Sequence, residues 1–278
     1  MKLGLINSAW FGSPLEGKAG LEKTKEIGFD TLDVFADPLD LSGEQYRQLV
    51  QDVKDTGLPS PSVVCVALGI ADFNPSVARF HVDRAKRHLD LAADLDAKNL
   101  LLVLGEYTWQ KEVITPEDQW KIAVDNTRQI GEYAASKGLE VALELEPFDL
   151  SLVNTIDEMV RFLDDVDNPA VKANIDCSHL WLKRIDASEI AKLRGRIAHV
   201  HISDCNGKTH GDLPPGRGNT PLKSYLQGLK EAGYDGVVSI ELEYSPEPDQ
   251  IVAWVTEAYA HTADLMRDAG VRGAVGGV

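Results

Sequence analysis

The chain has 278 residues, 44% of them hydrophobic, and a formal net charge of −16. The length suffices for one large domain with a substantial core, whereas the charge disfavours a nucleic-acid partner because it repels phosphate backbones. The sequence contains no run of about 18 apolar residues, the length of a membrane-spanning helix, and Asn7 and Ser8 interrupt any signal-peptide core. We therefore expect a soluble, cytoplasmic protein without a nucleic-acid or membrane partner.

Short β-rich runs alternate with longer amphipathic segments along the whole chain. For example, "DTLDVF" (30–35) precedes a helical segment (42–57) in which Ser42 is a predicted N-cap and Gly57 a helix stop. In chain order, the predicted strands occupy residues 3–8, 30–35, 61–68, 98–105, 139–147, 171–176, 196–203 and 236–244. The predicted helices that follow them occupy residues 21–28, 42–57, 75–95, 116–137, 155–166, 186–194, 222–233 and 248–269.

Eight consecutive strand–helix units predict an α/β fold with parallel strands, closed into a (β/α)₈ TIM barrel. The main competitor is an open, doubly wound sheet, but no G-x-G-x-x-G turn follows the first predicted strand. We therefore predict a single barrel domain over residues 1–270. Residues 271–278, "VRGAVGGV", are expected to form a flexible or subunit-contacting tail.

Two predicted strands carry a Glu-x-Glu pattern inside an otherwise apolar run, "VALELEP" (141–147) and "VSIELEY" (238–244). Residues two apart in a strand point to the same face, so each pattern aims two carboxylates one way. Catalytic residues of TIM barrels come from the C-terminal ends of strands and the loops that follow. The candidate residues at the ends of strands five to eight are Glu144, Glu146, Asp176, His199, His201, Glu241 and Glu243.

Carboxylates gathered at one barrel mouth repel each other, and a divalent metal would neutralise them. Oxygen ligands with one imidazole suit Mn²⁺, Mg²⁺ or Co²⁺, and the three cysteines lack the C-x-x-C spacing of a zinc ribbon. Each feature alone has another explanation. A Glu-x-Glu pair can be a solvated face, Asp176 can cap a helix, and His199 and His201 can be core residues. The joint pattern on four successive strand ends favours the metal site.

Trp10 and Trp109 follow the ends of the first and fourth predicted strands. Tryptophans at such positions pack the core by default, but these two could instead line a substrate pocket at the barrel mouth. Glu106, which follows "LVLG", is a candidate for the same reason.

Over nearly its whole length the chain resembles the xylose-isomerase-like sugar phosphate isomerase/epimerase barrels, which include ketose 3-epimerases, inosose dehydratases and the endonuclease IV group. The resemblance is carried by "GLEVALELEPFDLSLVNT", "VKANIDCSHLWL", "HVHISD", "LPPGRGNTP" and "GYDGVVSIELE". In that family, four side chains from strands five to eight bind one divalent metal. By position, the implied ligands are Glu144, Asp176, His201 and Glu241. Glu144 is chosen by its distance from Gly138, whereas counting back from Asn154 favours Glu146.

The family's substrate-contacting His, three residues after the ligand Asp, corresponds to His179. Its Arg shortly after the ligand His has no match where "DCNGKTHGD" forms a longer insertion, and Arg217 in "PPGRG" is the candidate substitute. The candidate substrate-binding residues are thus Glu146, His179, Arg217, Trp10, Trp109 and Glu243. Glu146 could equally support a metal ligand.

The resemblance implies an isomerase or epimerase that uses a divalent metal, Mn²⁺ first of all, to remove a proton next to the carbonyl of a sugar or keto-sugar through a metal-stabilised enediolate. Glu144 and Glu241 are the candidate acid/base pair.

The alternative is a lyase that eliminates a β-substituent from a keto-polyol or 3-keto-glycoside, which the missing Arg favours. An abasic-site endonuclease would need further histidines and a basic surface, and a non-enzymatic sugar-binding protein would bind metal without turnover. The family also implies a homo-oligomer or another subunit partner.

Overall fold

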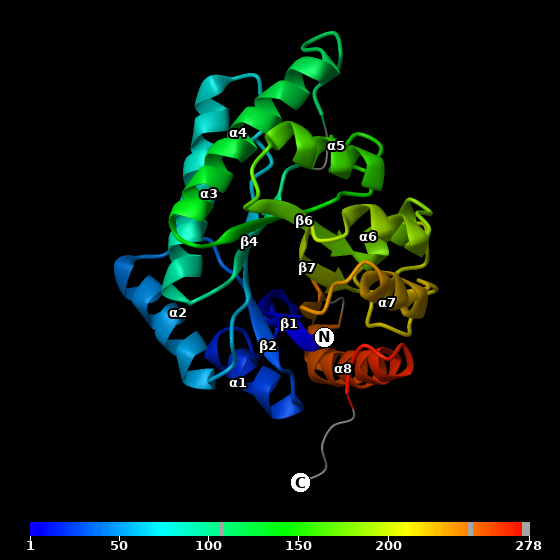
Figure 1. Ribbon diagram of the computed structural model, residues 1–278. Coiled ribbons are helices and arrows are strands. Elements are labelled where there is room, and N and C mark those ends of the chain that lie inside the picture. The colour runs from blue at the N-terminus through cyan, green and yellow to red at the C-terminus, as the bar shows by residue number, and fades with distance from the viewer. Residues whose placement is uncertain (106–107, 244–246, 274–278) are drawn as a thin grey trace.

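The central feature of the computed structural model, which describes residues 1–105, 108–243 and 247–273, is a closed barrel of parallel strands (Figure 1). Each strand pairs with its neighbour in chain order, and β1 closes the barrel against β8. The strands are β1 (Lys2–Ile6), β2 (Thr31–Phe35), β3 (Ser62–Val66), β4 (Asn99–Val103), β5 (Glu140–Leu143), β6 (Val171–Asp176), β7 (Ile197–Ile202) and β8 (Val237–Ile240). The predicted (β/α)₈ barrel is confirmed.

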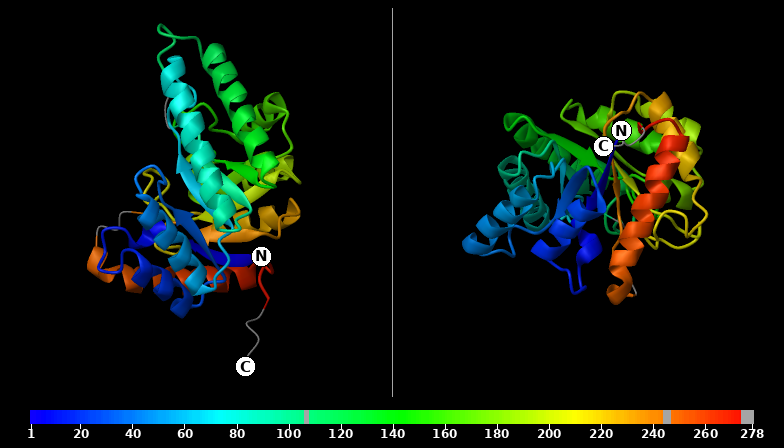
Figure 2. Two further views of the ribbon diagram at one scale, coloured as in Figure 1. Left: turned by 90° about the vertical axis from the view of Figure 1, so that its left-hand side faces the viewer. Right: turned by 90° about the horizontal axis from the view of Figure 1, so that it is seen from below.

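Helices cover the outside of the barrel, and α3 and α4 lie side by side along it (Figure 2). The α-helices of the described residues are α1 (Lys18–Ile27), α2 (Gly43–Thr56), α3 (Pro75–Asp94), α4 (Pro116–Ser136), α5 (Ile156–Val166), α6 (Cys177–Leu182), α7 (Leu222–Glu231) and α8 (Ile251–Asp268). Local signals set the ends of α2 as predicted. Ser42 and Gln45 form a reciprocal capping box at the start of α2, and Gly57 ends it with a φ of 68°.

Two helical segments differ in kind from the prediction. Helix α6 starts directly after β6, with the Asp176 carboxylate accepting from the His179 N–H as its N-cap. Its six residues are too few to show a helical period in the sequence. The predicted helix at 186–194 is a 3₁₀ helix, Ala187–Leu193.

Strands β5 and β8 are shorter than predicted and end one residue before the first glutamate of each Glu-x-Glu pattern, Glu144 and Glu241. The backbone nevertheless continues in line, since the Glu144 N–H donates to Leu102 O at 3.0 Å and the Glu241 N–H donates to Ile202 O at 3.1 Å. The two glutamates therefore stand at the rim of the barrel, just after the regular ladder, where their side chains can face the mouth.

The hydrophobic core lies mainly between the outer face of the strands and the helices. Inside the barrel, a small separate cluster of Ile6, Val64 and Leu101 fills the side formed by β1, β3 and β4. Further inward positions on β2, β6 and β7 are polar and almost fully buried: Asp33, Asn174, His199 and His201. Polar residues inside a packed barrel need partners. Asp33 and His199 lie within hydrogen-bond distance of each other, and Asn174 donates to Glu144 at the mouth.

The start of the predicted tail packs against the barrel. The Met1 ammonium donates to Val271 O at 2.6 Å, and Arg272 forms an ion pair with Asp30. Residues 274–278 of that tail lie outside the described residues. Within the described ranges, none of the helices combines the length and the apolarity needed to cross a membrane.

Candidate active site

Acidic and imidazole side chains from β5–β8 meet at the C-terminal mouth of the barrel. The ligand atoms of Asp176, His201 and Glu241 lie within 4.8 Å of one another, as do those of Glu144, Asp176 and His179. Asp176 belongs to both groups and so links Glu144 to His201 and Glu241. The four residues that the sequence singled out as metal ligands are therefore neighbours.

The hydrogen bonds within this cluster do not satisfy all of its carboxylate oxygens. Asp176 Oδ1 accepts from Ser178 Oγ at 2.7 Å and from His179 N at 2.9 Å. Asn174 Nδ2 donates to Glu144 Oε2 at 2.8 Å. Asp176 Oδ2 and Glu144 Oε1 remain buried without a hydrogen-bond partner among the described residues. Buried, unpaired carboxylate oxygens are costly, and a divalent cation is the partner that suits an oxygen-rich set with one imidazole.

The local electrostatics shift the pKa values of the acids in this cluster in opposite directions. Burial raises the pKa of both Glu144 and Glu241 well above the usual range, and neighbouring carboxylates raise both further. Burial also opposes the ionisation of Asp176, but His179 and Ser178 outweigh it and hold the Asp176 pKa below its usual range. Two glutamates whose pKa values are raised thus accompany an aspartate whose pKa is lowered.

Asp33 on β2 supports the cluster from inside the barrel and was missed by the sequence reasoning. Its Oδ2 lies 2.7 Å from His199 Nε2 and 3.6 Å from His201 Nε2. His201 Nδ1 then faces Glu241 Oε2 at 3.0 Å. Asp33 is fully buried, so its hydrogen bond fixes the orientation of the His199 imidazole, and its charge faces that of His201. The signal was present in "DTLDVF", where an acid breaks an otherwise apolar inner strand.

His179 lies beside the cluster at the start of α6. Its Nδ1 is 2.8 Å from Leu145 O and 3.5 Å from Glu144 Oε1, and burial lowers its pKa to about 4. Its Nε2 lies 2.8 Å from Nε2 of His210, a residue that sequence reasoning did not select. The neutral imidazole presents a polar edge to the mouth.

A family model described as "Xylose isomerase-like TIM barrel" matches residues 21–269. The chain belongs to this family. The resemblance carried by the strand-end motifs is thereby confirmed.

Three curated relatives are enzymes. The chain is 27% identical over 252 residues to a D-psicose 3-epimerase of Ruminiclostridium cellulolyticum, with 87% of this chain and 83% of the relative covered. Over 261 residues it is 23% identical to a fructoselysine 3-epimerase of Escherichia coli O157:H7, with 89% and 93% covered. A 3-dehydroshikimate dehydratase of Pseudomonas putida is 26% identical over 234 residues, covering 80% of this chain but only 35% of that longer one. The prediction of an enzyme is borne out.

Among solved structures, the IOLI protein with a binding zinc atom superimposes with a TM-score of 0.82 at 20% identity, covering 97% of this chain and 98% of that one. At this level of identity the match supports the xylose isomerase-like fold.

The second acid of each Glu-x-Glu lies beside the cluster. Glu146 is buried, and its N–H donates to Val153 O at 3.2 Å. Burial raises the pKa of Glu243 to about 7. Of the two glutamates that follow β5, Glu144 is the one that has a ligand atom grouped with Asp176 among the described residues. This grouping favours Glu144 over Glu146 as the candidate ligand.

Three other candidates are placed differently. Trp10 is 1% exposed and donates to Thr24 Oγ1, so its ring packs in the core beside α1. Trp109 is 46% exposed and lines a cavity of about 530 Å³ after β3 and β4, where it could meet a substrate. Arg217 forms a bidentate ion pair with Glu257 of α8 and stacks on Trp254 of the same helix, which engages its guanidinium away from the acidic cluster. Glu106 lies outside the described residues.

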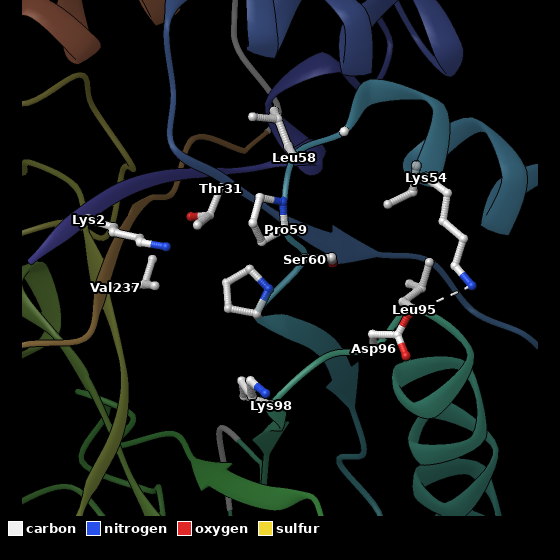
Figure 3. Close-up of a pocket in the computed structure, with 13 residues that line it drawn as sticks. Lys2, Thr31, Lys54, Leu58, Pro59, Ser60, Leu95, Asp96, Lys98 and Val237 are labelled. Atoms are coloured by element: carbon white, nitrogen blue, oxygen red, sulfur yellow. Dashed lines mark ion pairs between the residues drawn. The ribbon is translucent and has the colours of Figure 1, made fainter.

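A further cavity of about 540 Å³ opens at the opposite end of the barrel (Figure 3). Lys2, Lys98 and Pro59 are among its lining residues, and Lys54 pairs with Asp96 at its edge. It lies at the N-terminal ends of the strands, the end of a TIM barrel associated with stability. None of the potential metal-binding groups found among the described residues includes a residue that lines this cavity.

Proposed function

We propose that the chain is a divalent-metal-dependent epimerase that acts on the carbon next to the carbonyl of a ketose or keto-sugar. The observation that carries the proposal is the placement of two glutamates with raised pKa values, the buried Glu144 and the partly buried Glu241, on either side of Asp176 and His201 in strand order. The relatives named as sugar 3-epimerases support the same reaction class.

The metal would be held by Glu144, Asp176, His201 and Glu241. Bound there, a divalent metal would polarise the substrate carbonyl and neutralise charge that develops on its oxygen. We propose Mn²⁺ because three carboxylates and one imidazole form a hard, oxygen-rich donor set. The bound zinc of the IOLI protein shows that the fold can hold a divalent metal.

One glutamate would remove a proton from the substrate, and the other would supply a proton to it. One, as the carboxylate, removes the proton from the carbon next to the carbonyl, and the bonding electrons move to the carbonyl oxygen to give an enediolate. The other, in its protonated form, returns a proton to the opposite face of the same carbon. Raised pKa values serve this exchange because each glutamate must take and give a proton near neutral pH. Asn174, which donates to Glu144 Oε2, holds that carboxylate in position.

Elimination of a β-substituent is the second candidate. It shares the first proton abstraction and differs in what leaves afterwards. The dehydratase among the relatives favours it, as does the ion pair that Arg217 makes with Glu257 of α8, which engages the candidate substitute for the family's Arg.

The deciding experiment is proton exchange in D₂O. Mn²⁺-loaded protein is incubated with free ketoses, keto-inositols and keto-glycosides, and loss of C–H signals is followed by NMR. Deuterium uptake that requires metal and disappears in Glu144→Gln and Glu241→Gln supports enediolate chemistry, and the product separates an epimer from an eliminated group. Glu132→Gln, an exposed substitution on α4, is the matched control. Metal binding without uptake on any substrate would contradict the proposal.

A further inference from the structure

The cavity of about 530 Å³ beside Trp109 lies at the mouth end of the barrel but outside the acidic cluster. It is formed by the loops after β3 and β4, at the ends of α3 and α4 that project beyond the barrel (Figure 2). The Thr108 N–H donates to Leu150 O at 2.7 Å, which joins the cavity to the loop after β5. None of the potential metal-binding groups among the described residues includes a residue that lines it. A sugar held at the metal would therefore leave this space to another part of the substrate.

Apolar side chains are exposed in this cavity. Trp109 is 46% exposed, whereas Trp10 and Trp254 are 1% and 8% exposed. Leu68 and Val113, which also line the cavity, are 40% and 53% exposed. Single exposed apolar residues are common, but several gathered around one cavity mark a binding site. Core packing does not account for these three side chains, and a ligand would.

Three neighbours hold the exposed indole of Trp109 in place. Gln119, which is fully buried, accepts from the Trp109 N–H at 2.9 Å and donates from Nε2 to Trp109 O at 3.1 Å. The Trp109 Nε1–H donates to Asp72 Oδ2 at 3.3 Å. The Phe73 ring packs edge-on against the indole, with the ring centroids 5.1 Å apart and the planes at 72°. A ring fixed in this way loses little conformational entropy when a ligand binds to it.

The lining of the cavity suits an uncharged, apolar ligand. Among the described residues that line it there is no lysine, arginine or histidine to attract an anion. Asp72 is charged, but both of its carboxylate oxygens already accept hydrogen bonds, from Trp109 Nε1 and from the Asn74 N–H at 2.7 Å. Recognition is then left to the apolar surfaces of the indole, Leu68 and Val113. A flat aromatic ring gains both buried area and ring stacking on such a surface.

We propose that the cavity at Trp109 is a second subsite, which binds an aromatic group attached to the sugar. The substrate is then a keto-sugar with an aromatic substituent, such as an aryl keto-glycoside, rather than a free ketose. The cavity volume lies within the range of roughly 300–1,000 Å³ that is typical of ligand pockets. This inference rests on the proposed function, to which it adds a substrate class.

The first test needs no turnover. Phenyl β-D-glucoside and methyl β-D-glucoside, which lack a ketone, are titrated into the Mg²⁺-loaded protein, and the indole N–H signals are followed by ¹H–¹⁵N NMR. The Trp109 signal is assigned by its loss in Trp109→Phe. We expect it to shift with the phenyl glucoside and to stay in place with the methyl glucoside at the same concentration. No shift with the phenyl glucoside, or equal shifts with both compounds, would overturn the subsite.

The second test compares phenyl and methyl 3-keto-β-D-glucosides in the exchange assay. The parent should have a KM about 10-fold lower for the phenyl compound. Trp109→Ala should bring the two KM values within about 2-fold of each other and leave kcat unchanged. Trp109→Phe, which keeps an aromatic face, should retain most of the preference. A preference that survives Trp109→Ala in full would place the aromatic group elsewhere and overturn the subsite.

Leu39→Ala is the matched control for these variants. Leu39 is 45% exposed in the loop after β2 and does not line the cavity, so its truncation should leave the preference for the phenyl compound unchanged. Mn²⁺ affinity, measured by calorimetry, should be the same in the parent, Trp109→Ala and Leu39→Ala. Loss of the preference in Leu39→Ala as well would show that it does not depend on this cavity.

The two tests separate this inference from the proposed function. If the Trp109 signal responds to the phenyl glucoside alone but no compound exchanges a proton, the proposed function fails and the subsite stands. If protons exchange but the two keto-glucosides have equal KM values and the Trp109 signal does not respond, the subsite fails and the proposed function stands.

Discussion

The two halves of the barrel interior carry opposite chemistry. On the side of β1, β3 and β4, the inward residues Ile6, Val64 and Leu101 form an apolar cluster. On the side of β5–β8, acids and imidazoles fill the corresponding space and reach the mouth. The comparison indicates that one half stabilises the barrel while the other carries the proposed active site. Asp33 on β2 is the residue that joins the two halves, since it contacts His199 at 2.7 Å and lies 3.6 Å from His201.

The largest expected effect concerns the reactive half. Glu144→Gln and Glu241→Gln should each lower the rate of substrate deuterium exchange by about 100- to 10,000-fold, because an amide takes no proton from carbon. Single-turnover exchange measured at saturating Mn²⁺ tests this, and saturation is needed because both residues are also candidate ligands. A residual rate within about 10-fold of the parent in either variant would remove that glutamate from the acid/base pair.

Substitutions in the apolar half should lower the stability of the protein. Leu101→Ala, at a position only 1% exposed, should lower the free energy of unfolding by about 3 kcal/mol, because it removes buried methyl groups and leaves a cavity. Urea unfolding gives the value, and Mn²⁺ affinity of the folded variant should match the parent. If metal affinity falls together with stability, the two halves are coupled and the division is wrong.

Asp33→Asn tests the residue that joins the halves. The amide keeps the shape but removes the charge that orients His201, so Mn²⁺ affinity should fall about 10- to 100-fold. Calorimetric titration of Mn²⁺ measures the loss. Asp40→Asn, an exposed change in the loop after β2, is the matched control and should bind like the parent. Equal affinities for all three proteins would leave Asp33 with a purely structural role.

The sequence predicted more of the fold than of the site because the two depend on different kinds of information. Strand–helix alternation is periodic and local, so the barrel could be predicted, and Ser42 and Gly57 marked the ends of α2. The residues at the ends of β5–β8 could be collected because parallel strands end at one mouth. His210 could not be found this way, since its position depends on how Asp204 folds the irregular loop after β7 by accepting from the backbone N–H groups of Gly216 and Thr220. Asp33 was visible in its strand, but only the closed register places it beside His199 and His201.

The smallest expected effect is that of Trp109→Ala, which tests whether the apolar half contacts the substrate. Trp109 stands 46% exposed after β4, with its ring against Phe73 and its Nε1 donating to Asp72. If its face lines the substrate's path, Trp109→Ala should raise KM about 3- to 10-fold and leave kcat and Mn²⁺ affinity unchanged, as expected for the loss of a contact made equally in the ground and transition states. Val113→Ala, a smaller truncation in the same cavity, is the matched control. An unchanged KM would confine substrate recognition to the half of the mouth that carries the acids and the two facing imidazoles.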